Sequence, residues 1–479
     1  MAVTAEALPA TPHTDTGAPN EDRELARIFS WFTITATFWL VFATAIGLVL
    51  AFKFGAPEFW DSQFLTFGRL RPMHTNGTFY GFASIALVGC AYYITCRSCG
   101  TRLYSNGLAW ASLWLFNIAA AAGEIALDLG YNWGDLEYRE WPWPIRIVFL
   151  AAALVTAVNV IGTIAHRATK DIYLSNWYMV SALLQGAVIV IVALLPWYQY
   201  GLGQVAISGY FMHNAVGMWF TPLALGIFYY AIPKVLNRPI YSYGLGVLAF
   251  WTNLLFYPSL GGHHFLFSPL PWWLQTEAIV FSVAMLVPVW GGSANYLLTM
   301  RGRYHGRIES YPLAFLFIGV LAYLTGSTQG TIEALRPMQE LWHFTSFTVG
   351  HSHLTMYGFV AFAAWGGIYA LLPLATGKRP GTLGMAVHFW LAFVGVSIYV
   401  LSLSIGGSVA QGLEWIQGKP FIQSVEDMHP YYLWRGVGGI LMFLSHCVFA
   451  WNVWRMTGGK AGDAPSPVMR EEEQAEAAA

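Results

Sequence analysis

Residues 343–373 read HFTSFTVGHSHLTMYGFVAFAAWGGIYALLP, and this stretch decides the fold class. It contains no Asp, Glu, Lys or Arg. A helix needs about 20 apolar residues to cross the hydrocarbon of a bilayer. Because lipid offers no partner to backbone polar groups, an unbroken apolar run of this length predicts a membrane-spanning helix.

Similar apolar runs occur on both sides of this stretch. Together they predict twelve spans, near residues 28–52, 73–95, 106–128, 144–166, 173–197, 207–233, 243–262, 274–300, 310–332, 343–373, 384–410 and 432–455. We therefore expect an all-α integral membrane domain of twelve helices over residues 23–457. The polar ends, 1–22 and 458–479, are predicted to be disordered cytoplasmic tails.

The composition supports a chain whose main surroundings are a lipid bilayer. Of 479 residues, 56% are hydrophobic and only 10% are charged, whereas a soluble domain has roughly 25% charged residues. The formal net charge is −1, so no basic surface for nucleic acid is expected. Four cysteines are too few for the disulfide framework of a small secreted protein.

Basic residues gather in the short loops that follow every second predicted span. They are Arg97, Arg102, Arg167, Lys170, Lys234, Arg238, Arg301, Arg303, Arg307, Lys378 and Arg379. Loops rich in Lys and Arg remain in the cytoplasm. This pattern predicts that both termini are cytoplasmic.

Six histidines lie within or beside the predicted spans, all at a similar depth from the outer side. They are His74, His213, His263, His264, His351 and His353. For a single histidine in a membrane, a bond to backbone or a role in a transporter's proton relay is as good an explanation as metal ligation. Six at one depth favour metal ligation, because neutral imidazole is a common ligand of iron and copper.

The spacing of these histidines refines the metal prediction. His351 and His353 are two residues apart, so at ~100° per residue they point to nearly opposite faces of one helix. One helix is then able to ligate two metals. A six-coordinate haem needs a second axial ligand, for which His74 is a candidate. The other three histidines form a nitrogen set suited to copper facing a haem, which is an oxygen-reducing arrangement.

Several strings now carry a family resemblance. They are Phe67-Gly-Arg-Leu-Arg-Pro-Met-His74, His213-Asn-Ala-Val-Gly217, Arg238-Pro-Ile-Tyr-Ser-Tyr243, Gly261-Gly-His263-His264, Trp290-Gly-Gly and Gly350-His351-Ser-His353. In this order they resemble subunit I of the haem–copper oxidases, in particular the catalytic subunit of the cbb3-type cytochrome c oxidases. The resemblance covers the whole predicted bundle and leaves out only the tails.

The resemblance implies a role for each histidine. His74 and His353 match the axial ligands of the low-spin haem b, and His351 matches the proximal ligand of the high-spin haem b3. The implied copper ligands are His213, His263 and His264.

Tyr257 matches the redox-active tyrosine of this branch, six positions before the histidine pair. The resemblance implies that it is covalently linked to His213 and gives an electron and a proton when O2 is split. The alternative is an ordinary aromatic side chain, since the chain has 25 tyrosines. The offset from the copper pair favours the catalytic role.

Three other residues carry weaker predictions. Arg69 and Arg71 precede His74 and are candidates to bind haem propionates, because Arg recognises carboxylates through two hydrogen bonds. The alternative is that they anchor the chain at the membrane interface. Glu140 lies in a segment that resembles the region where the family has a calcium ligand.

Two positions depart from the family pattern, and both concern proton uptake. Gly246 stands where the family usually has a serine, and Gln329 stands where it usually has an acidic residue. Glycine has no hydroxyl group and glutamine does not ionise. The sequence therefore leaves open which groups carry protons to the site and whether protons are pumped. Tyr243 and Thr252 are candidate relay groups below Tyr257.

The resemblance implies a terminal oxidase of the bacterial cytoplasmic membrane that reduces O2 to water. The sequence contains no Cys-x-x-Cys-His, so electrons are expected from partner subunits, a membrane-anchored monohaem and a dihaem cytochrome c. One alternative is a nitric oxide reductase of the same superfamily, which the absence of glutamate around His213 disfavours. The other is a twelve-helix transporter, which would bind no haem.

Overall fold

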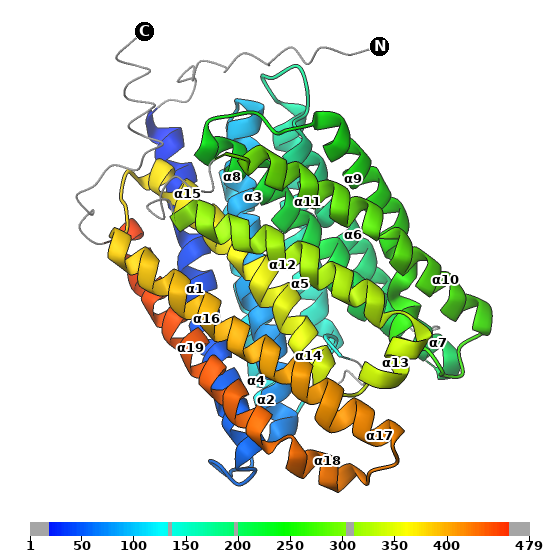
Figure 1. Cartoon of the computed structure of the whole chain (residues 1–479). Coiled ribbons are helices and arrows are strands. Elements are labelled where there is room, and N and C mark those ends of the chain that lie inside the picture. Colours follow the sequence, from blue (N-terminus) through cyan, green and yellow to red (C-terminus); the bar gives the residue numbers. More distant parts are fainter. Residues whose placement is uncertain (1–18, 133–136, 196–199, 303–310, 459–479) are drawn as a thin grey trace.

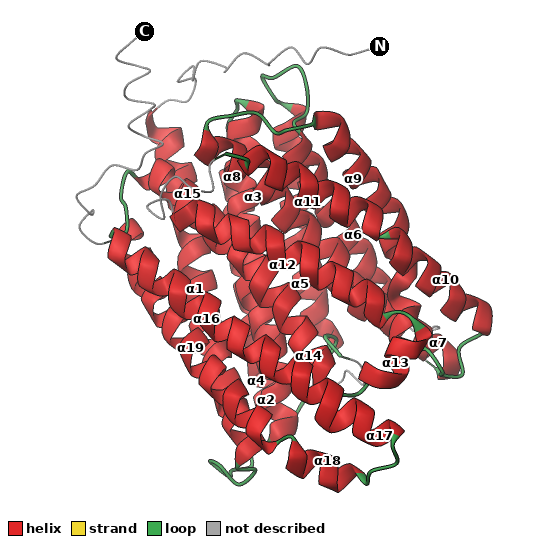
Figure 2. Ribbon diagram, in the orientation of Figure 1, coloured by secondary structure: helices red, strands yellow, loops and turns green. Residues whose placement is uncertain are grey.

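A computed structural model describes residues 19–132, 137–195, 200–302 and 311–458. In these ranges every regular element is a helix (Figure 2). This observation confirms the all-α prediction, which rested on long apolar runs of helical length.

The helices follow one another along the chain. They are α1 (Pro19–Gly55), α2 (Phe67–Asn76), η1 (Gly77–Ala83), α3 (Ser84–Cys99), α4 (Asn106–Asp128), α5 (Trp143–Ala165), α6 (Leu174–Leu194), α7 (Gly201–Asn214), η3 (Ala215–Phe220), α8 (Thr221–Leu236), α9 (Tyr243–Phe256), η4 (Tyr257–Phe265), α10 (Trp272–Ala284), α11 (Leu286–Met300), α12 (Tyr311–Glu333), α13 (Arg336–Trp342), α14 (Ser346–His353), η5 (Leu354–Ala361), α15 (Phe362–Thr376), α16 (Thr382–Gly406), η6 (Gly407–Leu413), α17 (Glu414–Ile416), α18 (Phe421–Asp427) and α19 (His429–Thr457). Residues 1–18 and 459–479, which make up most of the two predicted tails, lie outside the described residues.

Within the described ranges, 11 helices are long and apolar enough to cross a membrane, and they match eleven of the twelve predicted spans. The remaining span, predicted at 243–262, is built from two kinds of helix. Helix α9 ends at Phe256 and the 3-10 helix η4 continues it to Phe265. Pro258 has no backbone N–H to donate to the preceding turn, which favours a break at this point.

The bundle is arranged around a few central helices. Most residues of α3, α8 and α15 are buried, as expected for helices that are apolar on all sides. The last helix, α19, packs along α16 and α1. Helix α1 begins and α19 ends at the same end of the bundle, at the top of Figure 1, which agrees with an even number of crossings.

Three of the four described π-helical segments begin within three residues of a predicted ligand. Segment η1 follows His74, η3 follows His213, and η5 follows His353 directly. A π-helical turn widens the helix locally and is typical of functional sites. Each helix that ends with a predicted ligand is therefore separated from the next regular helix by a π-helical segment.

Two helix pairs are joined by the same set of hydrogen bonds. The backbone N–H of Ser105 donates to Asn159 Oδ1 at 2.9 Å, and Asn159 Nδ2 donates back to the Ser105 carbonyl at 2.9 Å. Ser242 and Asn295 repeat this exchange at 2.9 and 2.8 Å. This shared joint fixes the start of α4 against α5 and the start of α9 against α11.

Candidate metal centre

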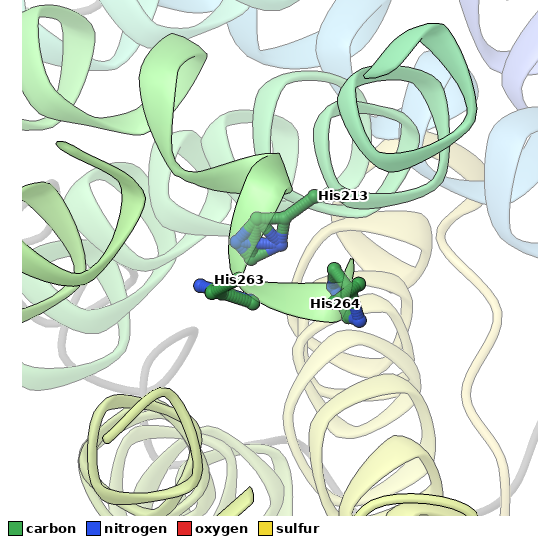
Figure 3. A group of neighbouring side chains, drawn as sticks. All are labelled: His213, His263 and His264. Atoms are coloured by element: carbon green, nitrogen blue, oxygen red, sulfur yellow. The ribbon is translucent and has the colours of Figure 1, made fainter. Parts of the chain in front are cut away.

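Three histidines form the centre of the candidate site. His213 comes from α7, whereas His263 and His264 come from η4 (Figure 3). Their ligand atoms all lie within 4.8 Å of one another. The Nε2 atom of His213 is buried without a hydrogen-bond partner. A nitrogen set of this kind, with one buried and two half-buried histidines, fits a copper ion, because imidazole is a preferred copper ligand.

A pair of glycines brings α7 and η4 together at this site. A Cβ atom on Gly209 would lie 2.5 Å from the Gly261 carbonyl oxygen, and one on Gly261 would collide with the Gly209 carbonyl oxygen. The two backbones are therefore in direct contact. Since Gly209 lies about one turn before His213 and Gly261 lies two residues before His263, this contact places the three rings side by side.

The hydrogen bonds of His263 settle which of its nitrogens is free for a metal. Ser282 Oγ donates its proton to the Ala278 carbonyl at 2.6 Å. The same oxygen lies 2.7 Å from His263 Nδ1 and must accept there. His263 Nδ1 therefore carries the proton, and Nε2 is left to bind a metal.

Tyr257 lies against the copper-ligand candidate His213. The two ring centres are 4.9 Å apart and the ring planes differ by 25°. Gly217 makes this contact possible, because a Cβ atom there would overlap the Tyr257 ring. The structure thus brings together the tyrosine and the histidine that the sequence motifs paired.

His74 of α2 and His353 of α14 form a second candidate site. Their rings are nearly parallel, with centres 6.3 Å apart and planes 17° apart. His74 Nδ1 lies 2.9 Å from the Ala43 carbonyl oxygen, and His353 Nδ1 lies 2.8 Å from the Val349 carbonyl oxygen. Both Nδ1 atoms donate, so both Nε2 atoms are free. With metal–imidazole bonds of about 2 Å, the gap fits one iron between the rings.

His351 has a different partner from His353. Its Nδ1 lies 3.1 Å from Gln329 Oε1 on α12. It also lies within electrostatic range of His213, His263 and His264. The arrangement of α14 therefore suits one ligand for each of two metals, as the spacing predicts.

The candidate propionate and calcium residues are already paired with protein groups. Arg69 donates to the Asp128 carbonyl oxygen, and Arg71 lies 3.2 Å from Glu140. Asn76 Nδ2 donates to the other Glu140 oxygen at 2.9 Å. Burial raises the pKa of the Glu140 carboxyl above its usual range, and the Arg71 guanidinium opposes this shift.

Calcium takes six to eight oxygen ligands. The cationic Arg71 faces the Glu140 oxygen that such an ion would need, so this arrangement does not fit calcium. The propionate roles of Arg69 and Arg71 stay predictions.

The two relay candidates are not brought together with Tyr257. Tyr243 begins α9 and is exposed, while Thr252 donates to the Leu248 carbonyl of its own helix at 2.7 Å. At Gly246, a Cβ atom would collide with Leu174 and lie 3.3 Å from Tyr229 Oη. The space that a serine would need is therefore filled by neighbouring side chains.

Sequence reasoning missed Arg435 on α19. Its guanidinium is buried, lies 4.0 Å from the ring centre of Phe54, and donates from Nε to Tyr399 Oη at 3.0 Å. It lies within electrostatic range of His74 and His353. An arginine near the start of the span predicted at 432–455 was the available signal, since ionisable residues in a membrane are functional by default.

The family of the chain follows from a comparison with known proteins. The family model described as "Cytochrome C and Quinol oxidase polypeptide I" matches residues 27–441. The chain belongs to this family. Its motifs and its buried histidines therefore occur in the setting of the haem–copper oxidases, as the sequence resemblance indicated.

Relatives of this family cover nearly the whole chain. A protein of Stutzerimonas stutzeri named cbb3-type cytochrome c oxidase subunit CcoN1 is 33% identical over 449 residues, which are 90% of this chain and 94% of that protein. A cytochrome c oxidase subunit 1 homolog of Agrobacterium tumefaciens is 31% identical over 470 residues, 92% of this chain and 86% of that protein.

A solved structure shares the fold. A chain from the cryo-EM structure of a haem–copper terminal oxidase dimer matches with a TM-score of 0.76 and 16% identity. The match covers 94% of this chain and 89% of that chain. At this identity the likeness establishes the family fold alone.

Proposed function

We propose that this chain is the catalytic subunit of a cbb3-type terminal respiratory oxidase, which reduces O2 to water. The contact between Tyr257 and His213 carries this proposal, because it places a phenol beside a three-nitrogen metal site. The names of the relatives from Stutzerimonas stutzeri and Agrobacterium tumefaciens support it.

In this proposal the histidines hold three groups. His74 and His353 hold a low-spin haem b, and His351 holds the high-spin haem b3. The copper ligands are His213, His263 and His264. When bound, these groups would supply three metal centres that accept electrons, and O2 would bind at the haem b3 and copper pair, because the low-spin haem has both axial positions filled.

Tyr257 supplies what the metals lack. Reduction of O2 to water consumes four electrons and four protons. A phenol gives one electron and one proton together, and Gly217 keeps the Tyr257 ring against His213. We propose the covalent His213–Tyr257 link on the same contact.

Protons and electrons reach the site from different sides. Tyr243 is the proposed entry for protons, since it is exposed at the start of α9 on the predicted cytoplasmic side. Thr252 bonds to its own helix, so its relay role needs a change of rotamer. Electrons are proposed to arrive through membrane-anchored monohaem and dihaem cytochrome c subunits, in the bacterial cytoplasmic membrane with both termini inside.

A nitric oxide reductase is the second candidate of the same superfamily. That branch uses iron with glutamates nearby in place of copper. Among the residues that the structure describes, no Asp or Glu joins the group of His213, His263 and His264. Together with the presence of Tyr257, this disfavours the reductase.

The Tyr257→Phe variant tests the proposal. Phenylalanine keeps the ring and removes the hydroxyl, so we expect the fold and the haem content to survive while O2 reduction falls by orders of magnitude. Any crosslinked His213–Tyr257 peptide is expected to vanish from mass spectra. Tyr92→Phe is the matched control, because Tyr92 is buried and bonds to Ser112 away from the site. Near wild-type O2 reduction in Tyr257→Phe would overturn the proposal.

A further inference from the structure

The three predicted haem ligands differ in what fixes them. His74 and His353 donate from Nδ1 to backbone carbonyls, whereas His351 faces the side chain of Gln329 at 3.1 Å. A backbone acceptor stays the same whatever the sequence. A side-chain acceptor depends on which residue occupies its position. The residue at position 329 therefore decides the charge and strength of the hydrogen bond that His351 Nδ1 makes.

Three consecutive residues of α12, namely Thr328, Gln329 and Gly330, determine how this helix meets His351. Thr328 Oγ1 donates to the Leu324 carbonyl at 2.7 Å and therefore accepts from Trp290 Nε1 at 3.0 Å, which ties α12 to α11. Gln329 follows it and contacts His351 Nδ1. At Gly330, a Cβ atom would lie 3.0 Å from Cε1 and 3.3 Å from Nε2 of His351. Glycine thus leaves the metal-binding edge of the ring uncrowded.

The proton of His351 is fixed by the need for a metal ligand. Iron binds through a nitrogen lone pair, so with Nε2 as ligand the proton lies on Nδ1. Nδ1–H then donates to Gln329 Oε1, and the amide oxygen carries no charge. A carboxylate at this place would accept the same proton more strongly and leave more negative charge on the imidazole.

The surroundings of Gln329 strengthen the effect that a charge at this position has on the His351 imidazole. Gln329 lines an open pocket of about 700 Å³ on the surface of the bundle between α11 and α12, whose walls include Leu297, Leu324, Ile332 and Phe347. Apolar walls screen a charge weakly, so a difference in charge at position 329 acts on His351 with little attenuation.

We propose that Gln329 is a positioning residue for His351 and that its neutral amide sets the reduction potential of the high-spin haem. It fixes the Nδ1–H tautomer and the orientation of the ring. Because it adds no negative charge to the ligand, it holds the potential above the value that a carboxylate would give. The inference rests on the proposed function, in which His351 is the proximal ligand.

The test uses the purified holoenzyme with the variants Gln329→Glu and Gln329→Leu. The measurements are the midpoint potential of the high-spin haem and the Fe–His stretching frequency of the reduced enzyme. We expect Gln329→Glu to lower the potential and raise the frequency, because charge on the ligand favours oxidised iron. We expect Gln329→Leu to lower the frequency and to weaken haem retention about 10- to 100-fold.

Thr325→Val is the matched control. Thr325 lines the same pocket and donates to the Leu321 carbonyl of its own helix at 2.8 Å, so neither measurement is expected to move. If Gln329→Glu fails to assemble, the Gln329→Leu frequency decides alone. An unchanged frequency in the variants that assemble would overturn the inference.

A His351→Ala variant separates this inference from the proposed function. If it retains the CO-binding haem and its Fe–His band, His351 is not the proximal ligand and the proposed function fails. If it loses that band while the Gln329 variants behave as wild type, only the role of Gln329 is refuted.

Discussion

The imidazole rings of His74 and His353 lie parallel at 6.3 Å, although they belong to helices from opposite halves of the chain. Each ring is fixed from behind by a backbone carbonyl. Two nearly parallel rings whose Nδ1 atoms are both occupied and whose Nε2 atoms are free suit one six-coordinate iron.

We expect His74→Ala and His353→Ala to produce the same defect. Each removes one axial ligand of the same iron, so both should lose the six-coordinate haem b signal in the optical spectrum. His388→Asn is the control, because His388 is a buried histidine that bonds to Tyr369 instead. A six-coordinate signal that persists in either alanine variant would contradict the shared site.

His351→Ala is expected to have a different effect from His353→Ala. It should abolish CO binding by the reduced enzyme and leave the six-coordinate signal intact, because the two side chains serve different irons. CO recombination after flash photolysis measures this directly. Loss of the same signal in both variants would refute the assignment of two metals to α14.

Gly217→Ala is expected to displace Tyr257 from His213. The added methyl group would overlap the tyrosine ring, and overpacking of this kind costs about 1–3 kcal/mol. O2 reduction and the crosslinked peptide should be lost while the low-spin haem stays. Gly55→Ala is the control, since Gly55 is exposed and its Cβ would meet nothing within 4 Å. Unchanged turnover in Gly217→Ala would show that the contact is dispensable.

Arg435→Leu is expected to lower the midpoint potential of the low-spin haem. A buried positive charge near His74 and His353 disfavours the oxidised iron, and its removal relieves that effect. A redox titration followed at the haem b band measures the shift. Arg455→Leu, at the far end of α19, should leave the potential unchanged. A rise of the midpoint potential in Arg435→Leu would contradict the claim that the positive charge of Arg435 disfavours the oxidised low-spin haem.

The sequence predicted the helical spans well because their signal is local. Each span is marked by a long apolar run with few or no charged residues, and only the span with Pro258 needed the structure to show its change to a 3-10 helix. The grouping of His213 with His263 and His264 was also predicted, from depth and from motif order.

Contacts between distant segments were beyond sequence reasoning. Nothing near Gln329 marks it as the partner of His351, and nothing near Arg435 marks its place beside two histidines. The matching hydrogen-bonded pairs Ser105–Asn159 and Ser242–Asn295 lie too far apart in the sequence to be recognised as a short repeat. Thr252 looked suited to a relay from its position, but its rotamer bonds to its own helix.

The most direct test of the central claim is the metal and haem content of the purified protein, measured together with its optical spectrum. We expect two b-type haems and one copper per chain, with one six-coordinate haem and one that binds CO. A chain without haem would match a twelve-helix transporter. Iron in place of copper would match a nitric oxide reductase, and either result would contradict the proposed oxidase.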